Sequence, residues 1–308
     1  MSFLFACAGG NNASLSSSLS SEPIQPNYAI PLDEAIASLG NANDARFDPS
    51  AITADPTSPL KGKTLYWLGS SVTYGSASSG YSMADYLAAK TGARCVKDAV
   101  SGTTLFDDGL TQNTGKKSYV RRLKESTAFQ KDDWVDAFIC QISTNDCTND
   151  RLTKRGALTD DTVFDAEAFD TATTLGAMEF IVSYVSDTWD CPVYFYSGAK
   201  FVDGNDKTKR QNANPLGSEY EKLVNQSIAL AKKWNKNRRY QVGVIDLYHD
   251  EVFNAAASDA YYAWATQDPI HPKKAGYLQW WEPYFEAFLS KELKLAKTPS
   301  RFGISQVL

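Results

Sequence analysis

Residues that commonly bind metals or form disulfides are scarce in this chain. Its 308 residues include five cysteines and two histidines, and no two cysteines have the C-x-x-C spacing. A structural zinc site is therefore not expected. Sequence alone leaves two states open for Cys95, Cys140, Cys147 and Cys191: two disulfides, or buried free thiols, which we favour.

An excess of positive charge and a long apolar segment are also missing. Lys and Arg number 31 against 36 Asp and Glu, which gives a net charge of −5 and an isoelectric point near 5.2. Nucleic acid is therefore not an expected partner, because its binding relies on clustered basic residues. No stretch of about 18 residues is free of charge and apolar throughout, so the sequence predicts no membrane-spanning helix.

Three common cofactor and nucleophile motifs do not occur. No two glycines are separated by a single residue, which excludes the G-x-G-x-x-G dinucleotide fingerprint. The residues between Gly109 and Ser118 have the wrong spacing for a phosphate-binding P-loop. Ser71 is followed by Val72 and Thr73 rather than by X-Gly, so the G-x-S-x-G elbow of α/β-hydrolases is absent.

The chain begins with a polar stretch. Residues 1–27 are rich in serine and predict a disordered tail. Within it, Leu4-Phe5-Ala6-Cys7 resembles a bacterial lipobox, in which Cys7 would be lipidated and would tether the protein to a membrane. A disordered or mis-started terminus is an equal alternative, because no basic segment precedes the apolar residues. The first interpretation implies a secreted or cell-surface protein, and a cytoplasmic protein is the alternative.

Residues 28–60 are expected to form an N-terminal arm. Leu32, Ala35, Ile36 and Leu39 have helical spacing, and Gly40 stands where such a helix would end. A Pro-rich connection leads to the main domain, expected at 61–296. Residues 297–308 form a C-terminal tail.

Short apolar runs alternate with helical patterns in the main domain. The expected strands are 65–68, 94–97, 137–142, 193–196 and 242–245, and helical spacing of apolar residues occurs at 83–87, 177–185, 220–231 and 278–289. Strands that alternate with crossover helices form a parallel sheet covered on both faces. We therefore predict an α/β fold, a three-layer α/β/α sandwich with a five-stranded parallel sheet.

Each of the two histidines follows an aspartate by three residues, as Asp246–His249 and Asp268–His271. A carboxylate at this spacing can orient an imidazole that acts as a general base. The spacing alone does not distinguish the two histidines.

Four short segments resemble, in order, the sequence blocks of the SGNH or GDSL hydrolases, a family of serine esterases and lipases with a flavodoxin-like fold. The segments are Gly69–Gly75, Val100–Thr104, Ser143–Asp146 and Asp268–Pro272. The resemblance runs from about Leu65 to the C-terminal helix.

This resemblance implies roles for particular residues. Ser71 would be the nucleophile, His271 its base, and Asp268 the group that orients the base. The oxyanion would be bound by the backbone amides of Ser71 and Gly102 and by the side chain of Asn145. Such a mechanism needs neither a metal nor an organic cofactor.

The resemblance also favours His271 over His249, because the family's base lies between the fifth strand and the last helix. Two positions depart from the family pattern: Ser70 replaces the aspartate before the nucleophile, and Ser143 replaces the glycine that opens the third block. These departures leave the substrate preference and the oxyanion geometry open.

The expected substrate is a short-chain carboxylic ester, either a small molecule or an acetylated glycan, with Tyr74 and Trp264 as candidate binding aromatics. The alternatives are a lipase, thioesterase or arylesterase of the same fold, and a non-catalytic glycan-binding module. Segment Asp150–Asp170 is expected either to border the pocket or to be a surface loop. The sequence does not indicate an oligomeric state.

Overall fold

The computed structural model describes residues 24–28, 32, 40–107, 116–213, 215–237 and 239–295. The lipobox at Cys7, nearly all of the helix expected after residue 32, and the tail at 297–308 lie outside these ranges. Among the helices described, none is long and apolar enough to cross a membrane.

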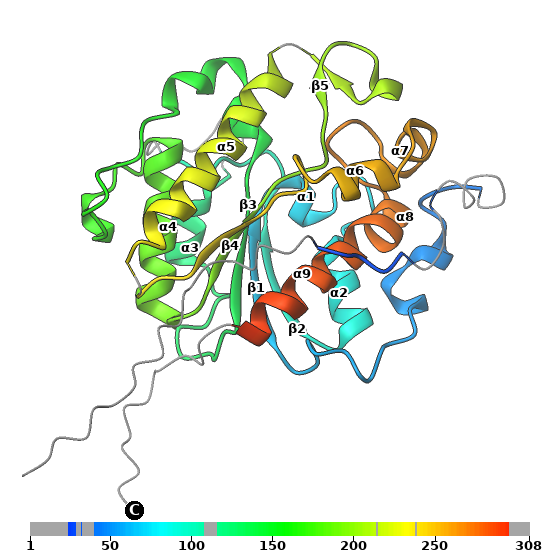
Figure 1. Cartoon of the computed structure of the whole chain (residues 1–308), viewed down its shortest axis with the longest axis horizontal. Helices are drawn as coiled ribbons and strands as arrows, with labels where there is room; N and C mark the ends of the chain where they lie inside the picture. The colour runs from blue at the N-terminus through cyan, green and yellow to red at the C-terminus, as the bar shows by residue number, and fades with distance from the viewer. Residues whose placement is uncertain are drawn as a thin grey trace, which may run out of the picture.

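A central sheet of five parallel strands has the order β2-β1-β3-β4-β7 (Figure 1). Its strands are β1 (Thr64–Gly69), β2 (Arg94–Ala99), β3 (Ala137–Gln141), β4 (Val193–Tyr196) and β7 (Val242–Ile245). All five coincide with predicted strands. The three-layer sandwich with a five-stranded parallel sheet is therefore confirmed.

Helices cover both faces of this sheet. Figure 1 shows α3 (Tyr119–Glu125), α4 (Thr174–Trp189) and α5 (Leu216–Trp234) on one side, and α2 (Met83–Thr91) and α9 (Glu282–Leu295) on the other. Four further elements pack on the second side: α6 (Glu251–Ala256), α7 (Asp259–Ala265), α8 (Lys274–Gly276) and the π-helical turn Tyr277–Trp281. The smaller elements are α1 (Ser71–Tyr74), β5 (Val202–Asp203), β6 (Gln211–Asn212), and the 3-10 helices Ala45–Phe47, Pro49–Ala51, Thr144–Cys147, Asn149–Lys154, Ala166–Ala168 and Lys207–Lys209.

The alternation of side chains along β1 explains why both faces are covered. Tyr66 and Leu68 belong to the core under α3, α4 and α5, whereas Leu65 and Trp67 belong to the core under α2 and α9. All four side chains are fully buried. A strand with two apolar faces is stable only between two layers of helices.

Helix α2 has clear boundary signals. Ser82 and Asp85 form a capping box at its start, and Gly92 ends it with a left-handed φ of 72°. The reciprocal side-chain contacts satisfy amide groups that the first helical turn leaves without partners.

The segment Asp150–Asp170 packs over α4 and α5. The amide and hydroxyl of Thr159 donate to the carboxylate of Glu179 at 3.0 and 3.1 Å. Lys233 donates to the same hydroxyl at 2.6 Å and forms an ion pair with Glu179, and both charged side chains are at most 4% exposed. At its beginning the segment also touches the expected site, because Arg151 donates to the carbonyl of Asn145 at 3.1 Å.

A second buried carboxyl group lies between α9 and α2. Glu282 is 0% exposed, and its closest cationic atom is Nζ of Lys90 at 4.0 Å. Burial and the neighbouring Glu286 raise the pKa of Glu282 to about 8, and Lys90 opposes them. This carboxyl group is therefore held in its neutral form at pH values well above its usual range.

No disulfide joins any two of the four described cysteines. Cys140, Cys147 and Cys191 are buried, and Cys95 is half-buried. The alternative of two disulfides among these residues is therefore wrong, and the burial that we favoured from the sequence is confirmed for three of the four.

Candidate active site

The order of the strands creates a crevice at the carboxyl edge of the sheet. The chain runs from β1 outward to β2 and then returns to β3 on the other side of β1. Loops that follow such a reversal point diverge and leave room for a ligand. Ser71 follows β1, Gly102 follows β2 and Asn145 follows β3, so three of the expected site residues come from this point.

A continuous chain of hydrogen bonds joins Ser71, His271 and Asp268. Oγ of Ser71 lies 2.8 Å from Nε2 of His271. On the other side of the ring, Nδ1 lies 2.9 Å from each carboxylate oxygen of Asp268. The structure therefore brings together the three residues that the resemblance assigned to nucleophile, base and orienting acid.

The loop between α7 and α8 holds the acid and the imidazole in one rigid unit. An isolated antiparallel bridge joins Thr266 to Pro272, and the amide of Gln267 donates to the carbonyl of His271 at 2.9 Å. Inside the loop, Oδ1 of Asp268 accepts from the amides of Ile270 and His271 at 2.9 and 3.0 Å.

These contacts also set the charge state of the acid. Burial alone would raise the pKa of Asp268, but the hydrogen bond and charge of His271 and the two amides outweigh it, and the pKa is lowered. Asp268 is therefore an anion at neutral pH, as an orienting group for an imidazole must be.

Gln141, the last residue of β3, holds the turn that carries Ser71. Its Oε1 accepts from the amides of Ser70 and Thr73 at 3.0 and 3.1 Å and from the Thr73 hydroxyl at 2.8 Å. Its Nε2 donates to the Ser70 hydroxyl at 3.0 Å. A Cβ at Gly69 would lie 1.7 Å from Oγ1 of Thr73, so this network requires glycine there. The hydroxyl of Ser70, which stands where the family has an aspartate, thus receives a hydrogen bond from the side-chain amide of Gln141.

The loop after β2, which carries Gly102, is joined to the loop after β3. Nδ2 of Asn145 donates to the carbonyl of Thr103 at 2.9 Å, which leaves its second N–H for another acceptor. Oγ of Ser143 donates to the same carbonyl at 3.2 Å and accepts from the amide of Asn145 at 3.1 Å. The second departure from the family pattern therefore adds a contact between the two loops. Gly102 has a φ of 84°, a conformation that favours glycine.

Asp146 makes a further link between these loops. Its buried carboxylate accepts from the amide of Leu105 at 3.0 and 3.2 Å and from the hydroxyl of Thr174 at 3.1 Å. Burial raises the pKa of Asp146 to about 6, against the effect of these hydrogen bonds.

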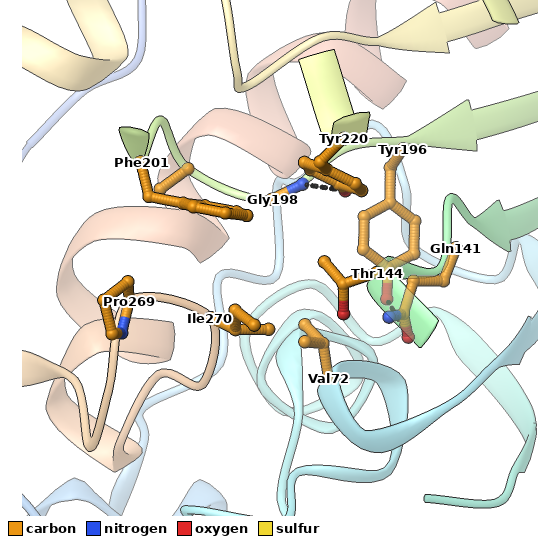
Figure 2. Close-up of a pocket in the computed structure, with 10 residues that line it drawn as sticks. Val72, Gln141, Thr144, Tyr196, Gly198, Phe201, Tyr220, Pro269 and Ile270 are labelled. Atoms are coloured by element: carbon orange, nitrogen blue, oxygen red, sulfur yellow. Dashed lines mark hydrogen bonds between the residues drawn. The ribbon is translucent and has the colours of Figure 1, made fainter. Parts of the chain in front are cut away.

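A small apolar pocket lies beside the triad (Figure 2). Its wall includes Val72, Thr144 and Ile270, the chain neighbours of Ser71, Asn145 and His271, and the other lining residues are Gln141, Tyr196, Gly198, Ala199, Phe201, Tyr220 and Pro269. Figure 2 shows the rings of Phe201 and Tyr220 on one side, with the hydroxyl of Tyr220 accepting from the amide of Gly198 at 2.8 Å. The pocket volume is about 10 Å³, the lower limit for holding one water molecule.

The second histidine forms a separate pair. Nδ1 of His249 lies 2.8 Å from Oδ2 of Asp246, and its Nε2 faces Oε1 of Glu221 at 3.7 Å. Both ring nitrogens of His249 thus face carboxylates, whereas Nε2 of His271 faces the Ser71 hydroxyl. Within the described ranges, no group of three or more His, Cys, Asp or Glu side chains is placed to hold a metal ion.

The two candidate aromatics lie in different surroundings. Tyr74 ends the short helix that begins at Ser71, and it is 47% exposed. The indole of Trp264 donates to the carbonyl of Gly40 at 2.7 Å and packs edge-on against Phe47. These contacts join Trp264 to residues of the N-terminal arm, and its role in substrate binding stays a prediction.

Sequence reasoning missed Gln141 and the function of Asp146 in this site. A polar residue at the end of an otherwise apolar strand is the only signal for Gln141, and it does not identify a partner. Asp146 adjoins Asn145 in the third block, but its bonds to Leu105 and Thr174 depend on the folded chain.

No family model matches the chain, and no curated protein matches it significantly. Solved structures do share its fold. A protein from Lactobacillus plantarum is 21% identical and superposes with a TM-score of 0.52, covering 78% of this chain and 100% of that chain. Two other solved structures are more distant. One is a putative arylesterase from Agrobacterium tumefaciens, with 14% identity, a TM-score of 0.47, and coverage of 75% of this chain and 98% of that chain. The other is a carbohydrate acetylesterase family member from Sinorhizobium meliloti, with 14% identity, a TM-score of 0.45, and coverage of 74% of this chain and 99% of that chain. Together with the strand order, the likeness to the Lactobacillus protein confirms the α/β fold that the resemblance to the SGNH hydrolases implied.

Proposed function

We propose that this protein is a serine esterase that hydrolyses short-chain carboxylic esters through an acyl-enzyme. The observation that carries the proposal is the chain of hydrogen bonds from Ser71 through His271 to Asp268. A hydroxyl on one ring nitrogen and a carboxylate on the other are the arrangement that activates a serine nucleophile.

In the acylation step, Oγ of Ser71 bonds to the ester carbonyl carbon while its proton passes to Nε2 of His271. Asp268 keeps the Nδ1 proton in place and stabilises the imidazolium. His271 then gives its proton to the leaving alcohol as the ester C–O bond breaks. A water molecule attacks the acyl-serine by the same route, and release of the acid restores Ser71.

Three donors would bind the oxyanion. Ser71 is the first residue of α1, so its amide has no partner within that helix. The amide of Gly102 and the second N–H of Asn145 approach from the neighbouring loops. Removal of one such donor is expected to lower kcat by about 10²–10³-fold.

The small pocket favours a short acyl group. Its walls are mostly apolar, and its volume of about 10 Å³ is too small for a long alkyl chain. An acetyl group would need the least displacement of these walls among the common acyl groups. The exposed ring of Tyr74, one helical turn from Ser71, offers a face on which a sugar can stack, which favours an acetylated carbohydrate as the substrate.

The test is turnover of p-nitrophenyl esters of increasing acyl length by the purified protein. We expect acetate to be the best substrate and octanoate to be poor. Ser71→Ala and His271→Ala should abolish turnover and labelling by a fluorophosphonate, whereas His249→Ala, the matched histidine variant, should retain both.

Two results would contradict the proposal. Faster turnover of octanoate than of acetate would favour a lipase or thioesterase. A folded wild type that binds glycans but neither turns over esters nor labels at Ser71 would favour a non-catalytic binding module.

A further inference from the structure

Arg122 places a buried guanidinium group beneath the site. The residue lies on α3, and its side chain is 7% exposed. Burying a cation is costly unless its charge and all of its donors are matched. The partners of this group therefore indicate what it does.

All five N–H groups of Arg122 have acceptors. Nη2 donates to the carbonyl of Gly69 at 2.7 Å and to Oγ1 of Thr103 at 3.2 Å. Nη1 donates to the carbonyl and carboxylate of Asp98 at 2.9 and 2.6 Å, and Nε donates to the carbonyl of Lys117 at 3.2 Å.

These acceptors lie on different loops of the site. Gly69 stands two residues before Ser71, and Thr103 directly follows Gly102. A single nitrogen, Nη2, thus bridges the turn that carries the nucleophile and the loop that carries an oxyanion donor. The carboxylate of Asp98, at the end of β2, neutralises the charge and fixes the plane of the guanidinium group.

We propose that Arg122 is a positioning residue that sets the spacing between the Ser71 hydroxyl and the Gly102 amide. The inference rests on the proposed esterase function and assigns no contact between Arg122 and the substrate. If the bridge is lost, the two loops separate, and the tetrahedral intermediate is stabilised less while the binding of the neutral ester changes little.

The planar fork of arginine is essential to this function. Two parallel donors on a rigid plane can reach two loops and a carboxylate at once, whereas a lysine ammonium is a single point on a flexible stem. Lysine at this position would keep the charge and lose the bridge.

The experiment compares Arg122→Met and Arg122→Lys with Arg121→Met in steady-state hydrolysis of p-nitrophenyl acetate. Arg121, the adjacent residue on α3, forms a two-point contact with Asp107 and none with Gly69 or Thr103. We expect kcat to fall about 10²–10³-fold in Arg122→Met and at least tenfold in Arg122→Lys, with KM and the apparent pKa of the pH profile close to wild type. A non-denaturing concentration of guanidinium ion should restore part of the activity of Arg122→Met, and Arg121→Met should resemble wild type.

The outcomes separate the two proposals. An active wild type with unchanged kcat in both Arg122 variants overturns the positioning role alone, and so does an equal loss in Arg121→Met. If Arg122→Met fails to fold, Arg122→Lys decides: a folded variant with reduced kcat supports the role, and wild-type kcat refutes it. A wild type without turnover overturns the esterase proposal and this inference with it.

Discussion

Replacing Gln141 with methionine should loosen the turn that carries Ser71 and destabilise the whole domain. The side chain is 2% exposed and accepts from two backbone amides, those of Ser70 and Thr73. Methionine keeps most of the volume and accepts hydrogen bonds only weakly. Each buried amide that loses its acceptor costs about 1–3 kcal/mol, so the two together cost about 2–6 kcal/mol.

The assays are urea denaturation, thermal melting and hydrolysis of p-nitrophenyl acetate. A loss of about 3 kcal/mol in a domain of this size corresponds to a fall in Tm of about 6–12 °C. If Ser71 shifts by about 1 Å as the turn relaxes, kcat should fall about 10²-fold.

Gln241→Met is the matched control for this prediction. Gln241 is half-buried, and its side chain donates to the hydroxyl of Tyr194 at 3.2 Å. Unlike the side chain of Gln141, it accepts from no backbone amide in the described part of the chain. We expect it to cost less than about 1 kcal/mol, the worth of one ordinary hydrogen bond. A cost as small as this in Gln141→Met, with wild-type kcat, would refute the reasoning.

Three other substitutions test Asp268 and two of the buried carboxyl groups, those of Glu282 and Glu179. Asp268→Asn should lower kcat by about 10⁴-fold, because an amide selects the wrong imidazole tautomer, while a stability measurement should show a folded protein. Burial holds the pKa of Glu282 at about 8 in the folded state, against 4.5 for an ordinary glutamate. Between these two pH values the folded state keeps a proton that the unfolded state has released. The free energy of unfolding should therefore fall as pH rises through this range, by up to about 1.4 kcal/mol per pH unit. Urea midpoints between pH 5 and 8 should therefore decline less in Glu282→Gln than in wild type, and parallel profiles would count against this account. Lys233→Met leaves the buried carboxylate of Glu179 without its cation and should cost about 3–5 kcal/mol, whereas Lys236→Met, which removes an exposed ion pair, should cost under about 1 kcal/mol in the same denaturation assay.

The parts of the fold that were predictable depend on local patterns. Four strands, β1, β3, β4 and β7, were found because strands covered on both faces have continuous apolar runs. The edge strand β2 is more polar and only partly buried, and its short run Arg94–Lys97 was the weakest of the five signals. Short helices such as α3 and α6 were missed because each has too few turns to show a clear period. The tiny β5 and β6 strands leave no apolar signal at all.

In the candidate site, residues within short motifs could be predicted from the sequence. The residues that hydrogen-bond to them from distant parts of the chain could not. The aspartate and histidine of the Asp268–His271 loop could be paired because they stand three positions apart. The contact of Trp264 with Gly40 joins residues 224 positions apart, so sequence could not show that this indole packs on the N-terminal arm. The donors that surround Oε1 of Gln141 are likewise determined only when β1 and β3 come together.

Ser71 and His271 stand 200 positions apart, so the ribosome makes the proposed nucleophile well before its base. At about 5–20 residues per second, the ribosome adds His271 about 10–40 s after Ser71. Any chain that stops in this interval carries a serine hydroxyl without its base. Esterase activity should therefore report chains that extend beyond His271, and products that end before it should be inert even where the sheet has begun to form.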